Sequence, residues 1–216
     1  MASKVRVLCL HGWGTNSEIM NYQLRHFRAS FGEDTEFVVL QAPNEIRKQS
    51  DHALEARFPG TYYEWFRREK IKNEHESFVY ETRGLERSIE VLEKFIEENG
   101  PFDGVLGFSQ GGVMAMVLIS LSASGRLKTT FKFGLLVAVA VMQMSEYWEH
   151  MPPDFPIIFF VGTKDPFKDS TYSNATYFTH SQFLTTEDDH RLPKLSPDEV
   201  ARVKEFMRLH SMSPKL

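Results

Sequence analysis

The feature that most constrains the fold is a pair of continuous apolar runs in the second half of the chain. Residues 134–142 read GLLVAVAVM and residues 156–161 read PIIFFV. A strand with one face in water alternates apolar and polar residues, whereas a strand that is apolar throughout is buried on both faces, as in a parallel sheet. These runs therefore predict two interior strands of a mostly parallel sheet with helices on both faces.

The rest of the chain alternates between strand and helix patterns. Further strands are predicted at residues 4–10, 36–41, 102–108 and about 181–186, and helices at about 17–29, 82–98, 109–122 and from 196 onward. This alternation predicts an α/β fold of the doubly wound type. No Gly/Ser linker divides the 216 residues, so we expect a single domain over residues 1–216. An irregular, aromatic-rich excursion at about residues 43–80 interrupts the alternation.

Composition narrows the class of protein. Asp and Glu number 29 against 25 Lys and Arg, and the resulting net charge of −4 argues against a nucleic-acid partner. The single cysteine, Cys9, excludes an internal disulfide and a multi-cysteine zinc site. The longest apolar stretch, 135–142, is far shorter than the roughly 18 residues of a membrane span. Lys4 and Arg6 interrupt the first apolar run, so no signal peptide is expected. We expect a reducing cytoplasmic or nuclear compartment.

The strongest chemical motif is Gly107-Phe108-Ser109-Gln110-Gly111, between a predicted strand and a predicted helix. This is the context of a nucleophile elbow, in which a serine sits on a sharp, strained turn above the sheet. Side chains at 107 or 111 would collide with the adjoining strand or helix, which explains the two glycines. The alternative is a tight strand-to-helix turn in which Ser109 merely caps the helix.

A serine hydroxyl needs a base to accept its proton, and in this fold the acid and the base follow the serine in that order. Asp165 comes directly after the strand that ends in PIIFFVG, with Asp169 as its rival and an Asx turn before Pro166 as its structural alternative. His190 follows the last predicted strand and is the expected base. His180 precedes that strand, and His210 falls on the apolar stripe of the last helix.

Acyl transfer also needs fixed donors for the oxyanion of the tetrahedral intermediate. We expect these to be the backbone N–H groups of Gln110, after the nucleophile, and of Trp13, in the loop that follows the first strand. The glycines at 12 and 14 would let that loop approach closely. His11 in the same loop is expected to be structural, because it stands on the wrong side of Ser109 in the chain order.

With these motifs the chain resembles the FSH family of serine hydrolases, which are small α/β-hydrolases with fungal and vertebrate members. The matching segments are VLCLHG at 7–12, Ala42-Pro43, Trp65-Phe66, NGPFDGVLGFSQG at 99–111, Gly162 with Asp165, and His190 with Pro193. The resemblance implies an α/β-hydrolase fold with about six strands and a Ser109–Asp165–His190 triad. It also implies hydrolysis of carboxylic esters or thioesters through an acyl-enzyme. The substrate would be a small-molecule ester, and no metal or organic cofactor is expected.

The chain departs from the family in three places. Asp188 and Asp189 replace two glycines before the histidine, the segment 165–190 is short, and residues 141–144 replace a small Ser-Gly turn. The first two departures bear on the positioning of His190, and the third bears on the pocket wall. The replacement by Asp188 and Asp189 leaves open an impaired hydrolase that only binds a small ligand or partner. In the excursion, Tyr63, Trp65 and Phe66 are expected to line an acyl pocket, with a surface-covering hydrophobic cluster as the alternative.

Overall fold

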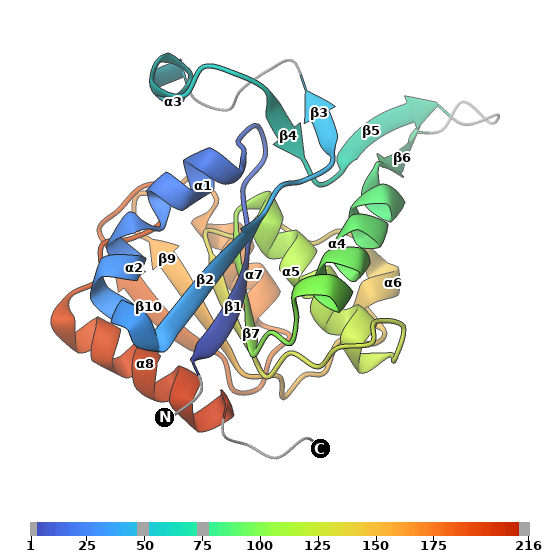
Figure 1. The fold of residues 1–216 in the computed structure, drawn as a ribbon. Helices are drawn as coiled ribbons and strands as arrows, with labels where there is room; N and C mark the ends of the chain where they lie inside the picture. The colour runs from blue at the N-terminus through green and yellow to red at the C-terminus, as the bar shows by residue number, and fades with distance from the viewer. Residues whose placement is uncertain (1–3, 47–51, 73–77, 212–216) are drawn as a thin grey trace.

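The computed structural model describes residues 4–46, 52–72 and 78–211 and shows one six-stranded sheet in the order β10-β9-β8-β7-β1-β2 (Figure 1). All neighbouring strands of this sheet are parallel. The two apolar runs become β8 and β9, which are interior strands, as the sequence predicted. The strands are β1 (Val5–Leu10), β2 (Thr35–Leu40), β7 (Gly104–Phe108), β8 (Phe133–Val137), β9 (Ile157–Gly162) and β10 (Gln182–Thr186).

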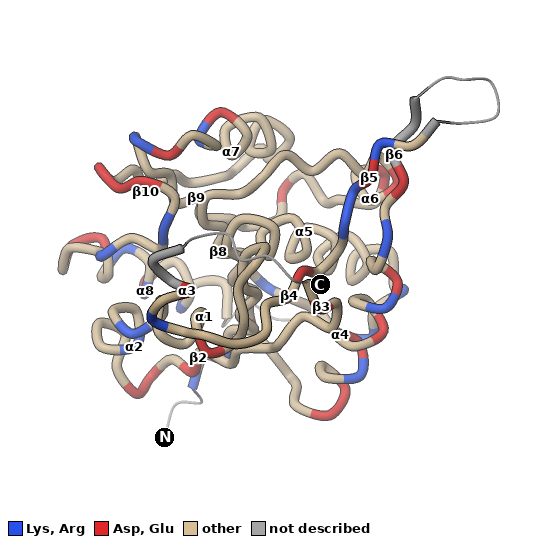
Figure 2. The backbone as a smooth tube through the Cα atoms, turned by 90° about the horizontal axis from the view of Figure 1, so that it is seen from above, with Lys and Arg blue, Asp and Glu red and all other residues tan. Residues whose placement is uncertain are grey.

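The sheet divides the interior into two hydrophobic cores because alternate side chains of each strand point to opposite faces. In β1, Val7 and Cys9 join one core and Leu8 and Leu10 join the other. Helices α1 (Ser17–Gln23), α2 (Arg25–Phe31) and α8 (Pro197–Ser211) cover the first core, and α4 (Leu85–Asn99), α5 (Gln110–Ala123), α6 (Ser145–Trp148) and α7 (Lys168–Ala175) cover the second. Figure 2 shows α1, α2 and α8 together on one side of the sheet and α4 and α5 on the other.

The excursion has more regular structure than the sequence suggested. It contains β3 (Asn44–Ile46), α3 (His52–Arg57), β4 (Tyr62–Glu64), β5 (Arg67–Lys72) and β6 (Phe78–Arg83). β3 pairs with β4 and β5 pairs with β6, both antiparallel. These elements lie beyond the end of the sheet opposite the N-terminus (Figure 1). The segment expected to be irregular thus contains short strands, which pair with one another and, through Tyr63, with Thr15. These strands are short and rich in charged residues, so they lack the apolar pattern that marks the strands of the main sheet.

Three predicted boundaries also differ from the structure. The helix expected at 17–29 is split at Leu24 into α1 and α2. The helix expected from residue 82 begins at Leu85, because β6 extends to Arg83 and Gly84 turns the chain with a φ of 78°. The strand expected at 134–142 ends at Val137, because Ala138 adopts a φ of 50° that a strand cannot continue.

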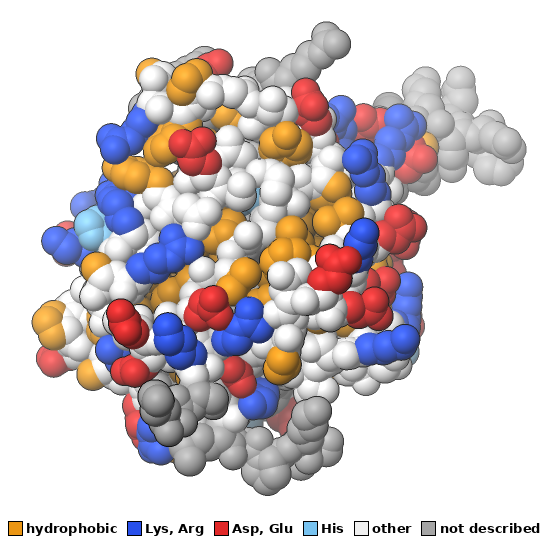
Figure 3. Space-filling view, in the orientation of Figure 1, with side chains coloured by type: hydrophobic (Ala, Val, Ile, Leu, Met, Phe, Trp, Pro, Cys, Tyr) orange, Lys and Arg blue, Asp and Glu red, His pale blue; other side chains and the backbone are white. Residues whose placement is uncertain are grey.

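The surface is mixed in character. In the view of Figure 3, acidic and basic side chains are interspersed around apolar ones and do not gather into a basic face. None of the helices in the described part of the chain has the length and the apolar character that crossing a bilayer demands.

Candidate active site

Ser109 lies between β7 and α5 in a conformation that residues with a side chain rarely adopt. Its φ and ψ are 54° and −116°, and such strain costs on the order of 1–3 kcal/mol. A Cβ on Gly107 would lie 2.5 Å from the Cα of Gly112, so the strand needs glycine there to meet the helix. A Cβ on Gly111 would lie 2.5 Å from the carbonyl oxygen of His11. The turn is therefore as tight as the motif predicted.

Asp165 and His190 continue a chain of hydrogen bonds that begins at Ser109. The Oγ of Ser109 lies 3.0 Å from Nε2 of His190. The Nδ1 of His190 lies 3.0 Å from Oδ2 and 3.1 Å from Oδ1 of Asp165. Because a carboxylate can only accept, Nδ1 carries the proton and Nε2 is free to accept from the serine hydroxyl. The structure brings these three predicted residues together, and it leaves Asp169 exposed on α7.

The acid and the base are held from several sides. The side chain of Asp165 is 1% exposed, and its Oδ1 also accepts the N–H of Phe167 at 2.7 Å. The rings of Phe108 and Phe167 each pack against the imidazole of His190, with centroids 5.0 Å apart in both pairs. The carboxylate is therefore shielded from water while the imidazole, 27% exposed, stays accessible to a substrate.

The two aspartates before His190 do not disturb this arrangement. The carboxylate of Asp189 pairs with Arg191, with Oδ2 and Nη2 2.5 Å apart, and this hydrogen bonding holds its pKa below the usual range. The carbonyl oxygen of Asp188 accepts the backbone N–H of Lys164 at 3.1 Å, which joins the loop of His190 to the loop of Asp165. The negative charge of Asp189 is thus directed to Arg191.

Trp13 and Gln110, the predicted oxyanion donors, belong to segments that meet at Ser109. A Cβ on Gly12 would lie 3.4 Å from the Cβ of Ser109, so the loop after β1 passes directly beside the nucleophile. Gln110 is the first residue of α5, where backbone N–H groups have no partner within the helix. Among the described residues, neither backbone N–H donates to a protein acceptor. Both are free to bind an oxygen of a substrate.

His11 is structural, as expected. Its side chain is buried, and Nε2 accepts the backbone N–H of Ala42 at 3.1 Å, so the proton sits on Nδ1 and is donated to the carbonyl oxygen of Gly12 at 2.8 Å. Burial lowers the pKa of His11 to about 4. The neutral imidazole therefore fixes the start of the loop that carries Trp13.

This low pKa makes stability depend on pH. Between the usual pKa of 6.5 and about 4, the unfolded chain binds a proton at His11 that the folded chain does not, so stability falls as the pH falls through that window. At pH 4.5 we expect a loss on the order of 2–3 kcal/mol relative to pH 7 from this residue alone. Urea unfolding at both pH values would measure it. His11→Gln should remove that part of the pH difference, whereas His180→Gln, at an exposed histidine, should leave it intact. Equal pH dependence in all three proteins would contradict the assignment.

An open cavity of about 1090 Å³ contains the serine and the histidine. Its walls come from the loop after β1, the α1–α2 region, the loop after β9 and the loop after β10. The lining residues are Gly12, Trp13, Thr15, Tyr22, Gln23, Arg25, His26, Phe108, Ser109, Pro166, Phe167, Asp188, Asp189, His190, Arg191, Leu192 and Lys194.

The structure does not bring Tyr63, Trp65 and Phe66 to this cavity. Trp65 is fully buried, and its indole N–H donates to the carbonyl oxygen of His11 at 2.8 Å. Phe66 is buried in the core beneath α4 and α5. Tyr63 is half-buried, and its backbone pairs with Gly14 and Thr15. These backbone and indole bonds turn the segment inward, so the rings pack instead of facing a substrate.

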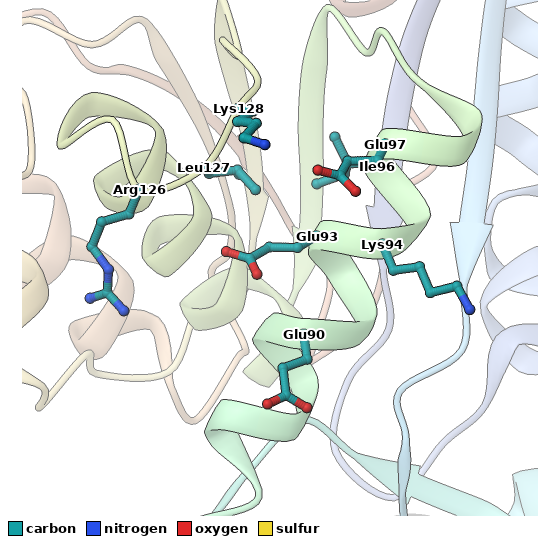
Figure 4. Close-up of a pocket in the computed structure, with 8 residues that line it drawn as sticks. All are labelled: Glu90, Glu93, Lys94, Ile96, Glu97, Arg126, Leu127 and Lys128. Atoms are coloured by element: carbon teal, nitrogen blue, oxygen red, sulfur yellow. The ribbon is translucent and has the colours of Figure 1, made fainter.

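A smaller hollow, of about 340 Å³, lies apart from the triad, between α4 and the turn after α5. Figure 4 shows its lining side chains, with carboxylates on α4 facing the segment of Arg126, Leu127 and Lys128. It contains none of the predicted site residues. Within the described parts of the chain, no group of three His, Cys, Asp or Glu side chains is placed to hold a metal ion.

Comparison with known proteins decides the family. The model of the family described as serine hydrolase (FSH1) matches residues 1–201. The chain belongs to this serine hydrolase family. Esterase alnB of Emericella nidulans is 33% identical over 111 residues, which are 51% of this chain and 34% of that esterase. Esterase CG5412 of Drosophila melanogaster is 27% identical over 212 residues, 95% of this chain and 75% of that protein. The chain thus spans about a third of the length of the fungal relative.

A solved structure confirms the predicted fold of this FSH1 family member. The crystal structure of SOBER1 from Arabidopsis thaliana superposes with a TM-score of 0.63 at 15% identity, covering 96% of this chain and 99% of that one. At that identity the likeness shows the α/β-hydrolase fold alone.

Two residues around the candidate active site of this FSH1 family member were not predicted. Phe167 is 49% exposed on the cavity wall and packs on His190. An aromatic residue two positions after the acid, in a strand-end loop, was the available signal. Glu64 is 4% exposed, and its carboxylate contacts the indole of Trp13. A single acid between Tyr63 and Trp65 was its signal, because a charge inside an apolar run must find a partner when it is buried.

Proposed function

We propose that the protein hydrolyses carboxylic esters or thioesters through an acyl-enzyme on Ser109, and that residues 1–216 act as one catalytic domain. The observation that carries this proposal is the 3.0 Å contact between Ser109 Oγ and His190 Nε2, on a serine held in a strained turn. Membership of a serine hydrolase family and the esterase names of the relatives support the same chemistry.

In the proposed reaction, Ser109 Oγ attacks the ester carbonyl while Nε2 of His190 takes its proton. Asp165 accepts the Nδ1–H of His190 and stabilises the imidazolium that forms. The backbone N–H groups of Trp13 and Gln110 donate to the oxyanion. His190 then protonates the leaving alcohol or thiol, which departs as the acyl-enzyme forms. Water attacks that acyl-enzyme with His190 again as base, and Ser109 recovers its proton.

Ligand binding without turnover would require that Asp188 and Asp189 disable the base. Asp189 is paired with Arg191, and both hydrogen bonds of His190 are formed. We therefore propose turnover.

A fluorophosphonate probe tests the proposal directly, because only an activated serine reacts with it. We expect stoichiometric labelling, mapped by mass spectrometry to the peptide that contains Ser109, and turnover of at least one member of a graded series of p-nitrophenyl esters and acyl thioesters. A folded protein that neither reacts with the probe nor turns over any of these substrates would refute the proposal.

Phe167 is expected to set the preference for acyl length. Its exposed ring forms cavity wall next to His190, so a longer acyl chain can bury apolar surface against it. Phe167→Ala should lower kcat/KM for the longer p-nitrophenyl esters by roughly tenfold, since about 1–2 kcal/mol of apolar contact is lost. The acetate ester should be affected by less than about threefold.

Val141→Ala is a matched control, because Val141 is 41% exposed and does not line the cavity. It should leave the whole series unchanged. An equal loss for every ester in Phe167→Ala would mean that the ring acts on His190 and does not bind the acyl chain.

A further inference from the structure

Glu64 is a buried carboxylate to which the proposed mechanism gives no part. It lies at the end of β4 in the excursion, and both of its oxygens are occupied. Oε2 accepts the indole Nε1–H of Trp13 at 2.7 Å, and Oε1 accepts Nε–H of Arg67 at 2.9 Å. Burying a carboxylate is costly unless it is paired and hydrogen-bonded. Its partners, Trp13 and Arg67, therefore indicate which side chains it fixes in place.

The conformation of Trp13 has to be fixed by contacts with other residues, because glycines flank it on both sides. Gly12 and Gly14 give the loop a wide choice of backbone conformations, and Gly14 itself has a φ of 66°. Trp13 is 37% exposed, so packing alone does not fix its side chain. The hydrogen bond to Glu64 fixes the side chain of Trp13. The backbone hydrogen bond from Gly14 N–H to Tyr63 O, 3.1 Å long, fixes the residue that follows it.

The same segment of the excursion also holds the second oxyanion donor. The side-chain oxygen of Gln110 accepts the backbone N–H of Trp65 at 2.9 Å, and its amide nitrogen donates to the carbonyl oxygen of Phe66 at 2.7 Å. Residues 63–66 therefore contact both residues whose backbone N–H groups would bind the oxyanion. The side chain of Gln110 is bound by backbone atoms of the excursion, whereas the indole of Trp13 is bound by the charged side chain of Glu64.

We propose that Glu64 is a positioning residue of the oxyanion hole, which acts by fixing Trp13. This rests on the proposed function of the site. A preorganised donor stabilises charge that develops only in the transition state, so misplacing it lowers kcat and leaves substrate binding largely unchanged. Loss of a whole donor costs about 10²- to 10³-fold. Loosening one donor should cost less than that.

The first test is Glu64→Ala, measured with the best p-nitrophenyl ester. We expect kcat to fall about tenfold or more with KM within a factor of about two, and the rate of fluorophosphonate labelling to fall in parallel. Glu64→Gln keeps an acceptor oxygen for the indole, and Arg67 retains its contact with Glu69, whose Oε1 lies 3.9 Å from Arg67 Nη1. In this variant kcat should therefore stay within about threefold of wild type. Glu69→Gln, on β5 and likewise bound to arginines, is the matched control and should have no effect.

A double-mutant cycle separates positioning from general support of the fold. Trp13→Phe removes the indole N–H and keeps a ring and the backbone. If Glu64 acts through that N–H, Trp13→Phe should lower kcat as Glu64→Ala does, and the double variant should fall no further. Should Glu64→Ala fail to fold, Trp13→Phe alone still carries the test, because it leaves the Glu64–Arg67 pair intact. Additive losses, or a wild-type kcat in either single variant, would overturn the proposal.

A readout without turnover distinguishes this proposal from the proposed function. The indole ¹⁵N–¹H resonance of Trp13, identified by its loss in Trp13→Phe, should move in Glu64→Ala, whereas the indole resonances of Trp65 and Trp148 should stay in place. An unmoved Trp13 resonance would refute the contact itself. A wild-type protein with neither turnover nor probe labelling would refute the proposed function and, with it, any part of Glu64 in the reaction. Active wild type with a fully active Glu64→Ala variant would refute only the positioning.

Discussion

The Ser109→Ala variant should lose at least about four orders of magnitude in kcat and all labelling by fluorophosphonate. The proposed chemistry passes through a bond from Ser109 Oγ to the acyl carbon, and alanine offers no atom that can form it. Loss of the nucleophile in a comparable triad lowers kcat about 10⁶-fold, and the turnover that remains comes from the oxyanion donors and binding. Active-site-independent hydrolysis of the ester sets the floor of the measurement.

The fold should survive this change, because among the described residues the hydroxyl makes a single hydrogen bond, to His190. Circular dichroism and the unfolding midpoint should therefore match those of the wild type. Ser124→Ala is a suitable control at the opposite end of α5, where the hydroxyl donates to the carbonyl oxygen of Leu121. It should retain full turnover. A Ser109→Ala protein with kcat within about tenfold of wild type would show that another group is the nucleophile.

The Asp165→Asn variant should lose about 10⁴-fold in kcat with little change in KM. Oδ1 of Asp165 accepts the N–H of Phe167, so an asparagine there keeps its carbonyl oxygen on Phe167 and turns its amide N–H₂ toward His190. Nδ1 of His190 would then have to accept, which places the ring proton on Nε2. In that tautomer Nε2 cannot take the proton of Ser109, and this is the known cost of such a substitution in a triad.

Asp169→Asn is the matched control, because Asp169 is exposed in the first turn of α7 and has no contact with the histidine. We expect kcat within about twofold of wild type. Steady-state kinetics of both variants on one ester, with burst amplitudes to count active sites, would decide the assignment. A larger loss in Asp169→Asn than in Asp165→Asn would reverse it.

The sheet was predictable because its strands carry their own signature. Strands buried on both faces must be apolar throughout, so 134–142 and 156–161 were visible without knowledge of their neighbours. The order of Ser109, Asp165 and His190 was predictable for a related reason. Each follows the end of a strand, and the carboxyl ends of parallel strands lie at one edge of the sheet.

The excursion was not predictable, since its structure depends on partners far along the chain. The rings of Tyr63, Trp65 and Phe66 read equally well as a pocket wall or as a packed cluster, and only the bond from the Trp65 indole to His11 O decides where that side chain goes. The cavity wall was missed for the same reason. Tyr22 and Arg25 reach it from the break between α1 and α2, which an unbroken predicted helix conceals.

The way the excursion is attached makes the stability of the candidate active site differ from the stability of the sheet. Its strands pair with one another outside the sheet, and residues 63–66 join it to the two loops at Ser109. Detaching this segment would expose the buried rings of Trp65 and Phe66, but it costs less free energy than unfolding the two cores, because most of their side chains come from the sheet and its helices. Local opening of the excursion would release both proposed oxyanion donors while the sheet stays folded. The temperature at which the proposed activity is lost would then depend on about forty residues beside the sheet, whereas the melting temperature of the protein would depend on the sheet itself.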